Sequence, residues 1–325
     1  MIQFALASVM SLAMPGTAFA QAAGDANWPT KPIRLIAPFP PASTVDVVSR
    51  LLGQKLSERL GQQIVVDNRV GASGNIGADA VAKATPDGYT IGVVTSSTHA
   101  VAVTLSPNLP YDPIKDFTPI SMIASSPYAL VMYPGVPAKT IPELVALAKS
   151  KPGVLNYGSA GPASLAHLAG ALFATLSDID LAHIPYKSTA QSVIDLISGR
   201  LEMQFATIAP TLANIRAGQL RALAVTSKKR VEALPDVPTM DEAGVRGYEA
   251  TLWFALVAPA KLPANMTMRL NREVNDILGT PEMKEALAQQ GFLTEGGPPE
   301  AVTEQIRTDI AKWREVIPRA GISAQ

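Results

Sequence analysis

The sequence contains no cysteine and no excess of charge of either sign. Its 325 residues include 27 Lys plus Arg and 27 Asp plus Glu, so the formal net charge is zero. Without Cys, disulfides, thiolate nucleophiles, cysteine metal ligands and the lipid-bearing Cys of a lipoprotein are excluded. The balanced charge gives no indication of a nucleic-acid partner, which needs a clustered basic surface. With 47% hydrophobic and 17% charged residues, the composition is that of an ordered globular protein.

Long apolar runs are also absent, apart from one at the amino terminus. Residues 1–20 carry no charge and contain an apolar run from Ile2 to Met14, a Pro15-Gly16 break and the small-residue sequence Ala18-Phe19-Ala20. This pattern predicts a secretory signal peptide over residues 1–20, cleaved before Gln21. The usual basic start is missing, which indicates either an upstream start or an atypical signal. A membrane anchor is the alternative, although the short run and its Pro-Gly break disfavour it. We therefore expect a soluble periplasmic protein.

From Trp28 onward, short β-rich runs alternate with amphipathic helices, which predicts an α/β fold with mainly parallel sheets. The clearest unit is the stretch from Ile33 to Leu60. An apolar strand leads through a proline-rich loop to a helix that the Ser43-x-x-Asp46 capping box begins and Gly61 ends. The free backbone N–H groups at such a helix start can bind an anion without a charged side chain. The alternative is an ordinary strand–helix corner with nothing bound.

Later segments repeat this plan. Strands predicted near residues 155–157, 183–184 and 203–205 each run into a short polar loop and a helix, and ligands of open α/β sheets bind at such strand ends. A strand at 120–124 is expected to stop at Pro127 and restart at Tyr128. The simplest assembly has two α/β lobes joined by crossings near Pro127 and Leu252, with the C-terminal helices returning to the first lobe.

Motifs for phosphate binding and catalysis are missing. Gly71-x-x-Gly74-x-x-Gly77 lacks the start of a dinucleotide fingerprint and is read as a tight turn before a helix, and no nucleophile elbow occurs. The three His lie in three different segments without metal-ligand spacing, so no metal site is predicted. Ser164 and His167 lie one helical turn apart, which leaves a nucleophile pair as an alternative to a helix cap at Ser164.

Several predicted loops are instead rich in small hydroxyl residues: Ala42–Thr44, Thr95–Thr98, Ser159–Gly161 and Ala206–Thr207. Hydroxyls and backbone N–H groups between two lobes suit polar, anionic small molecules. The sequence therefore predicts binding and not bond breaking, with no cofactor.

A series of short segments, in order along nearly the whole mature chain, resembles one family. The segments are Lys31–Ile36 with Pro38–Pro40, Asn68-Arg69 with Gly74–Gly77, Pro86–Tyr89, Leu109–Asp112, Leu155–Gly161, Pro185–Lys187, Leu220–Thr226 and Leu234–Thr239. They are similar to the signatures of the periplasmic substrate-binding proteins of tripartite tricarboxylate transporters, the Bug family.

The resemblance implies a two-lobed periplasmic binding protein of type II, with two mainly parallel or mixed sheets flanked by helices and a two-strand hinge. Residues 28–126 and 253–325 would form lobe 1, and residues 127–252 lobe 2. A di- or tricarboxylate, aromatic ones included, would be captured between the lobes by hinge closure and delivered to the membrane subunits of a transporter. The protein would act as a monomer.

The resemblance also implies ligand-binding positions. They are Phe39, Ala42, Ser43, Thr44 and Asp46 in the first loop, Ser96, Ser97 and His99 in its neighbour, and Ser159, Ala160, Pro162, Ala163, Ser164, Tyr186, Ala206 and Thr207 in lobe 2.

The chain departs from the family pattern at three places. Ala42 and Ser43, after Pro41, replace two glycines, which stiffens the first loop. Residues 162–165 replace Asn-Gly-Thr-Ser, and Ala206 replaces an Asp that would contact an amino group. These changes predict a less polar mono- or dicarboxylate, aromatic ones included, and not an amino acid. Two alternatives remain open: a periplasmic esterase-like hydrolase using Ser164 and His167, and a ligand sensor for a membrane receptor kinase.

Overall fold

The computed structural model describes residues 27–186 and 189–323. The predicted signal peptide lies outside the described residues. In chain order the elements are β1 (Ile33–Ala37), α1 (Thr44–Leu60), β2 (Ile64–Asn68), the 3-10 turn η1 (Ala72–Gly74), α2 (Asn75–Ala82), β3 (Thr90–Thr95), the π-helical turn η2 (Ser97–Val101), α3 (Ala102–Leu105), β4 (Phe117–Met132), α4 (Ile141–Ser150), β5 (Asn156–Ser159), α5 (Leu165–Ser177), β6 (Ala182–Pro185), α6 (Thr189–Ile197), β7 (Met203–Thr207), α7 (Ile208–Arg216), β8 (Arg221–Val225), β9 (Thr251–Pro259), α8 (Ala264–Gly279), α9 (Pro281–Gln289), β10 (Leu293–Thr294) and α10 (Pro299–Arg319).

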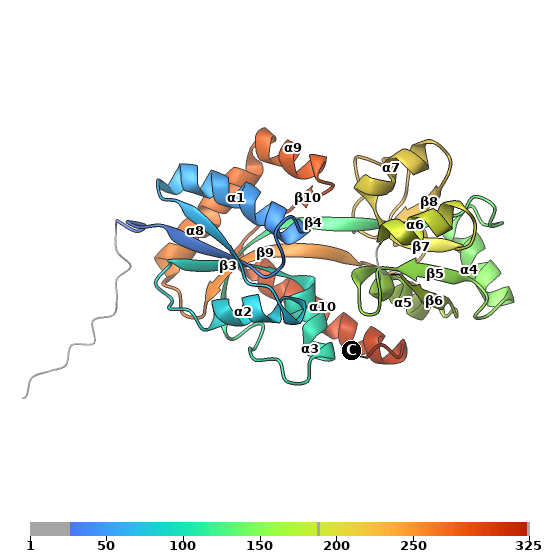
Figure 1. Ribbon diagram of the computed structural model, residues 1–325, viewed down its shortest axis with the longest axis horizontal. Coiled ribbons are helices and arrows are strands. Elements are labelled where there is room, and N and C mark those ends of the chain that lie inside the picture. The colour runs from blue at the N-terminus through green and yellow to red at the C-terminus, as the bar shows by residue number, and fades with distance from the viewer. Residues whose placement is uncertain (1–26, 187–188, 324–325) are drawn as a thin grey trace, which may run out of the picture.

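The described strands form two sheet regions that share β4. Their order is β2-β1-β3-β9-β4-β7-β5-β6, with β10 and β8 also paired to β4. Neighbours β1–β2, β1–β3, β5–β6 and β5–β7 are parallel, whereas β4 and β9 pair antiparallel with their partners. Figure 1 shows the two regions as separate lobes, one with α1, α2, α8 and α9 and the other with α4 to α7. The predicted two-lobed α/β fold is confirmed.

Helix boundaries follow the capping signals in the sequence. Ser43 caps α1 by accepting the Asp46 N–H at 3.3 Å, and Gly61 ends it in the left-handed conformation at φ +67°. Thr140 and Ser164 cap α4 and α5 in the same way.

The expectation that Pro127 interrupts a strand is wrong. β4 runs unbroken from Phe117 to Met132. Pro127 is the last residue of β4 that pairs with β9, opposite Thr251, and Tyr128 is the first that pairs with β7. The missing proline N–H thus falls where the strand changes partners, so that the sheet tolerates it.

The C-terminal helices do not all stay with the first lobe. α8 and α9 pack into its core through residues such as Leu270 and Leu287. The end of α10, in contrast, places Trp313, Val316 and Ile317 in the same apolar cluster as α5 of the second lobe. Figure 1 shows α10 running below the sheet from one lobe towards the other. Besides the crossings of β4 and β9, α10 therefore forms a third connection.

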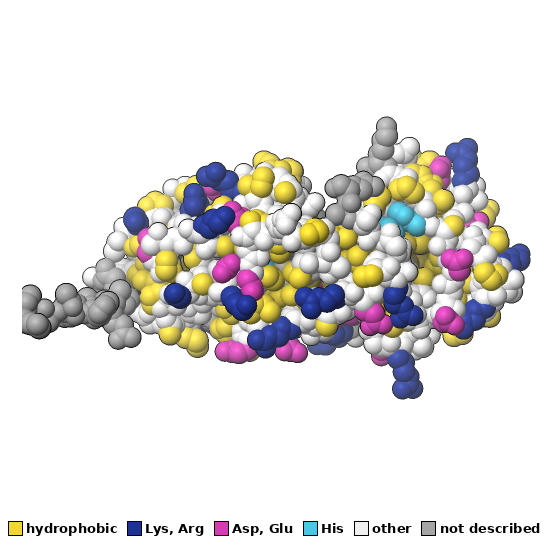
Figure 2. Space-filling view, turned by 90° about the horizontal axis from the view of Figure 1, so that it is seen from below, with side chains coloured by type: hydrophobic (Ala, Val, Ile, Leu, Met, Phe, Trp, Pro, Cys, Tyr) yellow, Lys and Arg dark blue, Asp and Glu magenta, His cyan; other side chains and the backbone are white. Residues whose placement is uncertain are grey.

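Charged side chains of both signs are interspersed on the face shown in Figure 2, and neither sign forms a continuous patch there. Among the described residues, no helix combines the length and apolar character that crossing a membrane requires.

Candidate functional site

A cavity of about 580 Å³ is lined by residues of both lobes. The first lobe contributes Phe39, Ser73, Asn75 and Ser97, and the second contributes residues 162–164. Further lining residues are Ala72, Val101, Ala102, Leu105, Ser106 and Ser323. None of the described lining residues carries a charge, and the polar ones offer hydroxyl, amide and backbone groups. Phe39, Ser97, Pro162, Ala163 and Ser164 are five of the predicted ligand-binding residues.

The start of α1 is occupied by a carboxylate of the chain itself. Asp46 is 3% exposed and accepts hydrogen bonds from the Ala42 N–H at 2.9 Å and from Arg50 Nε at 3.0 Å. Asn68 Nδ2 donates to it as well, at 2.9 Å. Burial raises the pKa of Asp46, but these hydrogen bonds outweigh burial and hold it below its usual value. The Ala42 N–H, just before the helix start that was considered as an anion site, is therefore already bonded.

Phe39 forms a wall of the cavity and is held by close packing. A Cβ placed on Gly74 would lie 2.9 Å from the Phe39 ring and 2.8 Å from Thr98 Cγ2. Gly74 has a φ of +93°, and Ala72 and Ser73 before it have φ values of +46° and +55°. These three successive residues with positive φ bring the backbone against the Phe39 ring. At Gly74, where the two touch, only a glycine leaves enough room.

Asn75 follows this turn and faces the cavity at the start of α2. The Tyr111 hydroxyl lies 2.9 Å from Asn75 Oδ1 and 2.8 Å from the Thr98 carbonyl, so its single proton is shared between these two acceptors. Tyr111 thereby links Asn75 to η2. Sequence reasoning missed Ala72, Ser73 and Asn75, although the glycine-rich run from Gly71 to Gly77 marked the turn that brings them to the cavity.

The second-lobe wall is the loop from Ser159 to Ser164. Ser164 Oγ donates to the Gly161 carbonyl at 2.7 Å and accepts the His167 N–H at 3.3 Å. The His167 ring does not face this hydroxyl but accepts the Ala163 N–H at its Nδ1, at 3.1 Å. Ser164 is therefore a helix cap, and the geometry contradicts the Ser164–His167 nucleophile pair of the esterase alternative.

The other predicted ligand-binding residues do not line the cavity. His99 is fully buried, and its ring centroid lies 4.5 Å from that of Phe117, so burial lowers its pKa to about 3. Ser96 and Ala206 are also buried, whereas Ala160 is exposed. The remaining members are Ser43 and Thr44 at the start of α1, Ser159 at the end of β5, Tyr186 after β6 and Thr207 at the start of α7. Direct ligand contact by these residues stays a prediction.

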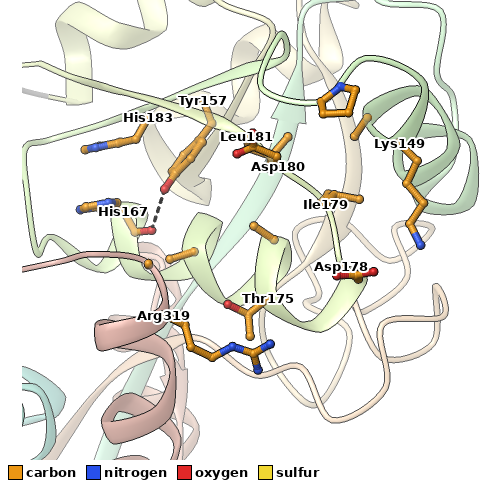
Figure 3. Close-up of a pocket in the computed structure, with 15 residues that line it drawn as sticks. Lys149, Tyr157, His167, Thr175, Asp178, Ile179, Asp180, Leu181, His183 and Arg319 are labelled. Carbon is orange, nitrogen blue, oxygen red and sulfur yellow. Dashed lines mark hydrogen bonds between the residues drawn. The ribbon is translucent and has the colours of Figure 1, made fainter.

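A larger cavity, of about 690 Å³, lies between the second lobe and the end of α10. Its labelled residues in Figure 3 include Tyr157, His167, His183, Lys149 and Arg319. Size alone would favour it as a ligand site, but it draws its lining from α4, β5, α5, β6 and the end of α10 and includes none of the first-lobe loops. Within residues 27–186 and 189–323, no group of three or more His, Cys, Asp or Glu is placed to hold a metal ion.

Comparison with known proteins agrees with this geometry. A family model described as the tripartite tricarboxylate transporter family receptor matches residues 48–322. The chain is 36% identical to Protein BugT of Bordetella pertussis, over 91% of each chain. Among solved structures, Rpa4515 of R. palustris with adipate is 36% identical with a TM-score of 0.73, covering 92% of this chain and 100% of that one.

MatC of Rhodopseudomonas palustris with bound malate is 29% identical with a TM-score of 0.69, and the match covers 89% of this chain and 100% of that one. The family match spans most of the chain, and the fold, the two converging walls and the relatives agree. The chain belongs to the tripartite tricarboxylate transporter receptor family, the Bug family of periplasmic solute-binding proteins.

Proposed function

We propose that the protein captures an organic carboxylate in the interlobe cavity by hinge closure and delivers it, in the periplasm, to the membrane subunits of a tripartite tricarboxylate-type transporter. The observation that carries the proposal is the uncharged cavity of about 580 Å³ with Phe39 and Ser97 on one wall and residues 162–164 on the other. A ligand that contacts both walls stabilises the closed form, because only that form makes both sets of contacts.

The cavity lining is consistent with a carboxylate held without a counter-cation. The hydroxyl groups of Ser73 and Ser97 line the cavity together with backbone groups, and hydroxyl and backbone N–H donors can solvate an anion through hydrogen bonds. The solved structures of two similar proteins, Rpa4515 with adipate and MatC with bound malate, support a dicarboxylate as the ligand. The same cavity has apolar lining at Phe39, Val101 and Pro162, which favours a ligand with methylene or aromatic carbons between or beside its carboxylates.

The hinge in this proposal is the pair of crossings beside Pro127 and Thr251. Next to it, the Tyr128 N–H donates to Thr226 Oγ1 at 2.8 Å, and the Thr226 N–H donates to the Tyr128 carbonyl at 2.9 Å. These bonds tie β4 to β8 on the second-lobe side, so rotation is expected on the first-lobe side of Tyr128. The division of the chain into residues 28–126 with 253–325, and 127–252, is part of the proposal.

A thermal-shift and calorimetric screen of the mature protein tests the function. The panel contains adipate, malate, citrate, aspartate, benzoate and phthalate. A ligand at 100 times its Kd adds about 2.7 kcal/mol to the free energy of unfolding, which corresponds to roughly 4 °C for a chain of this length. Failure of every carboxylate to bind overturns the proposal. If citrate or aspartate stabilises the protein and neither adipate nor the aromatic acids do, the prediction of a less polar carboxylate ligand is wrong.

A pair of matched variants locates the site. Ser97→Ala removes a hydroxyl from the cavity wall. It is expected to lower the affinity for the carboxylate about tenfold, which corresponds to the loss of one hydrogen bond to a charged group. Ser150→Ala removes an exposed hydroxyl at the end of α4, which bonds only its own helix at Leu147, and should leave affinity unchanged. Equal affinities for the two variants would place the ligand elsewhere.

A further inference from the structure

Two histidines from separate parts of the chain are stacked behind the second-lobe loop. His167 on α5 and His183 on the edge strand β6 have ring centroids 3.6 Å apart and planes inclined by 5°. The Tyr157 ring lies beside them, 5.1 Å from His183, and Figure 3 shows the three side chains together at one end of the larger cavity. Tyr157 in turn sits against Gly170, where a Cβ would come within 2.2 Å of the ring. Close packing of Tyr157 against Gly170 of α5 therefore limits the movement of the stacked rings.

Each histidine is hydrogen-bonded to a different residue of the loop from Ser159 to Ser164. His183 Nε2 lies 2.6 Å from Ser159 Oγ, at the end of β5 where the loop begins. His167 Nδ1 accepts the Ala163 N–H at 3.1 Å, just before α5. A backbone N–H can only donate, so His167 must be neutral, with its proton on Nε2. Burial and the neighbouring His183 favour this state by lowering the pKa of His167 to about 4.

We propose that the stacked pair His167–His183 is a positioning element that holds the loop from Ser159 to Ser164 in its ligand-binding conformation and so sets affinity without touching the ligand. The proposal rests on the proposed function of the interlobe cavity. Pro162, Ala163 and Ser164 line that cavity, whereas neither His167 nor His183 does.

The loop needs such support because its backbone conformation is unfavourable. Gly161 has a φ of +107° and Ala163 a φ of +59°. A left-handed alanine costs about 1–2 kcal/mol and persists only where surrounding bonds hold it. The bond from Ala163 to His167 does this at the strained residue itself. It resembles a capping box in which His replaces Glu or Gln at the third helical position and reaches one residue further back. Without it, the wall formed by residues 162–164 is free to relax away from the cavity.

Two substitutions of His167 separate hydrogen bonding from packing. His167→Asn places an amide oxygen near the position of Nδ1 and can still accept the Ala163 N–H, whereas His167→Leu fills similar space without an acceptor. Phe173→Leu is the control, because it loosens the same helix in the core beside Phe205 and lies six residues from the loop contact. With adipate as the probe, we expect about tenfold weaker binding for His167→Leu and binding within about threefold of wild type for the other two.

Amide hydrogen exchange at Ala163 supplies a readout that needs no ligand. Exchange should be slow in the wild type and in His167→Asn and about tenfold faster in His167→Leu, and ¹⁵N spectra of labelled His should show His167 unprotonated at Nδ1. Unchanged Ala163 exchange in His167→Leu, or equal loss of affinity in all three variants, would overturn the proposal. If no carboxylate binds the wild type, the proposed function is overturned and with it the role of the pair in affinity. The exchange data would then still show whether the pair holds the loop.

Discussion

Replacement of Gly74 by alanine tests how the first-lobe wall is built. Gly74 precedes α2 with a φ of +93°, and its missing Cβ leaves room for the Phe39 ring and the buried methyl group of Thr98. Gly74→Ala therefore combines two penalties: an L-residue in the left-handed region and a collision at 2.8–2.9 Å with two neighbours. Phe39 lines the cavity, so any relief of the collision must move part of the candidate ligand site.

The two penalties can be given separate magnitudes. The left-handed conformation costs alanine about 1 kcal/mol relative to glycine. Overpacking against buried groups adds about 1–3 kcal/mol, and the branched Thr98 side chain has little freedom to yield. Together Gly74→Ala should lower the free energy of unfolding by about 3 kcal/mol. Gly218→Ala is the matched control, because Gly218 has a φ of +70° with nothing within 4 Å of the added Cβ. It should cost only about 1 kcal/mol.

Urea unfolding of both variants, followed by circular dichroism, measures the difference between them. Isothermal titration with the carboxylate found in the screen should show severalfold weaker binding for Gly74→Ala and wild-type affinity for Gly218→Ala. If the two variants differ by less than about 0.5 kcal/mol in stability, the collision with Phe39 and Thr98 is not what Gly74 avoids, and the reasoning fails.

Three further predictions concern other parts of the fold. Asp309→Ala should lower the free energy of unfolding by about 3–5 kcal/mol in urea titration. It leaves Trp253 Nε1 without its acceptor and removes the buried ion-pair partner of Lys312 Nζ, each 2.7 Å from the carboxylate, so that Lys312 keeps only the Glu249 carbonyl; a loss below 1 kcal/mol would contradict this. His99 has a folded pKa of about 3 against 6.5 when unfolded, so the unfolded state binds more protons as pH falls below 6.5 and stability is lost in that direction. Between pH 7.5 and 4.5 His99 should contribute about 3 kcal/mol to this loss, and His167, whose pKa is lowered to about 4, adds a loss of its own over the same range. The loss in His99→Phe should therefore be smaller than in the wild type by about 3 kcal/mol, and an unchanged slope in that variant would refute the assignment. Ala42→Gly should raise stability by about 0.5–1 kcal/mol in the same titration, since Ala42 has a φ of +63°, and a destabilised variant would show that the alanine is needed.

Local signals in the sequence predicted much of the secondary structure. Ser43 and Ser164 cap helices as predicted, because a cap depends on residues only a few positions apart. The prediction that Pro127 interrupts a strand was wrong, because the effect of its missing N–H depends on where β4 changes partners. The return of α10 to the second lobe was missed for a related reason: its apolar face predicts burial but does not say against which helix.

In the candidate site, too, some features were predicted from the sequence and others were not. The family resemblance implied Phe39, Ser97 and residues 162–164 as ligand-binding positions, and these residues line the cavity. The bonding of the Ala42 N–H by Asp46 was not predicted, since a capping-box spacing does not reveal which N–H the acid accepts.

The sequence alone determined where helices begin, which segments alternate as strands and helices, and which family signatures the chain carries, because each of these is written in neighbouring residues. Only the tertiary structure decided that His167 and His183, sixteen positions apart, stack behind one loop, and that Gly74 makes room for Phe39. Such contacts depend on how separate elements pack, and packing distances of a few ångströms are not encoded in the spacing of residues along the chain.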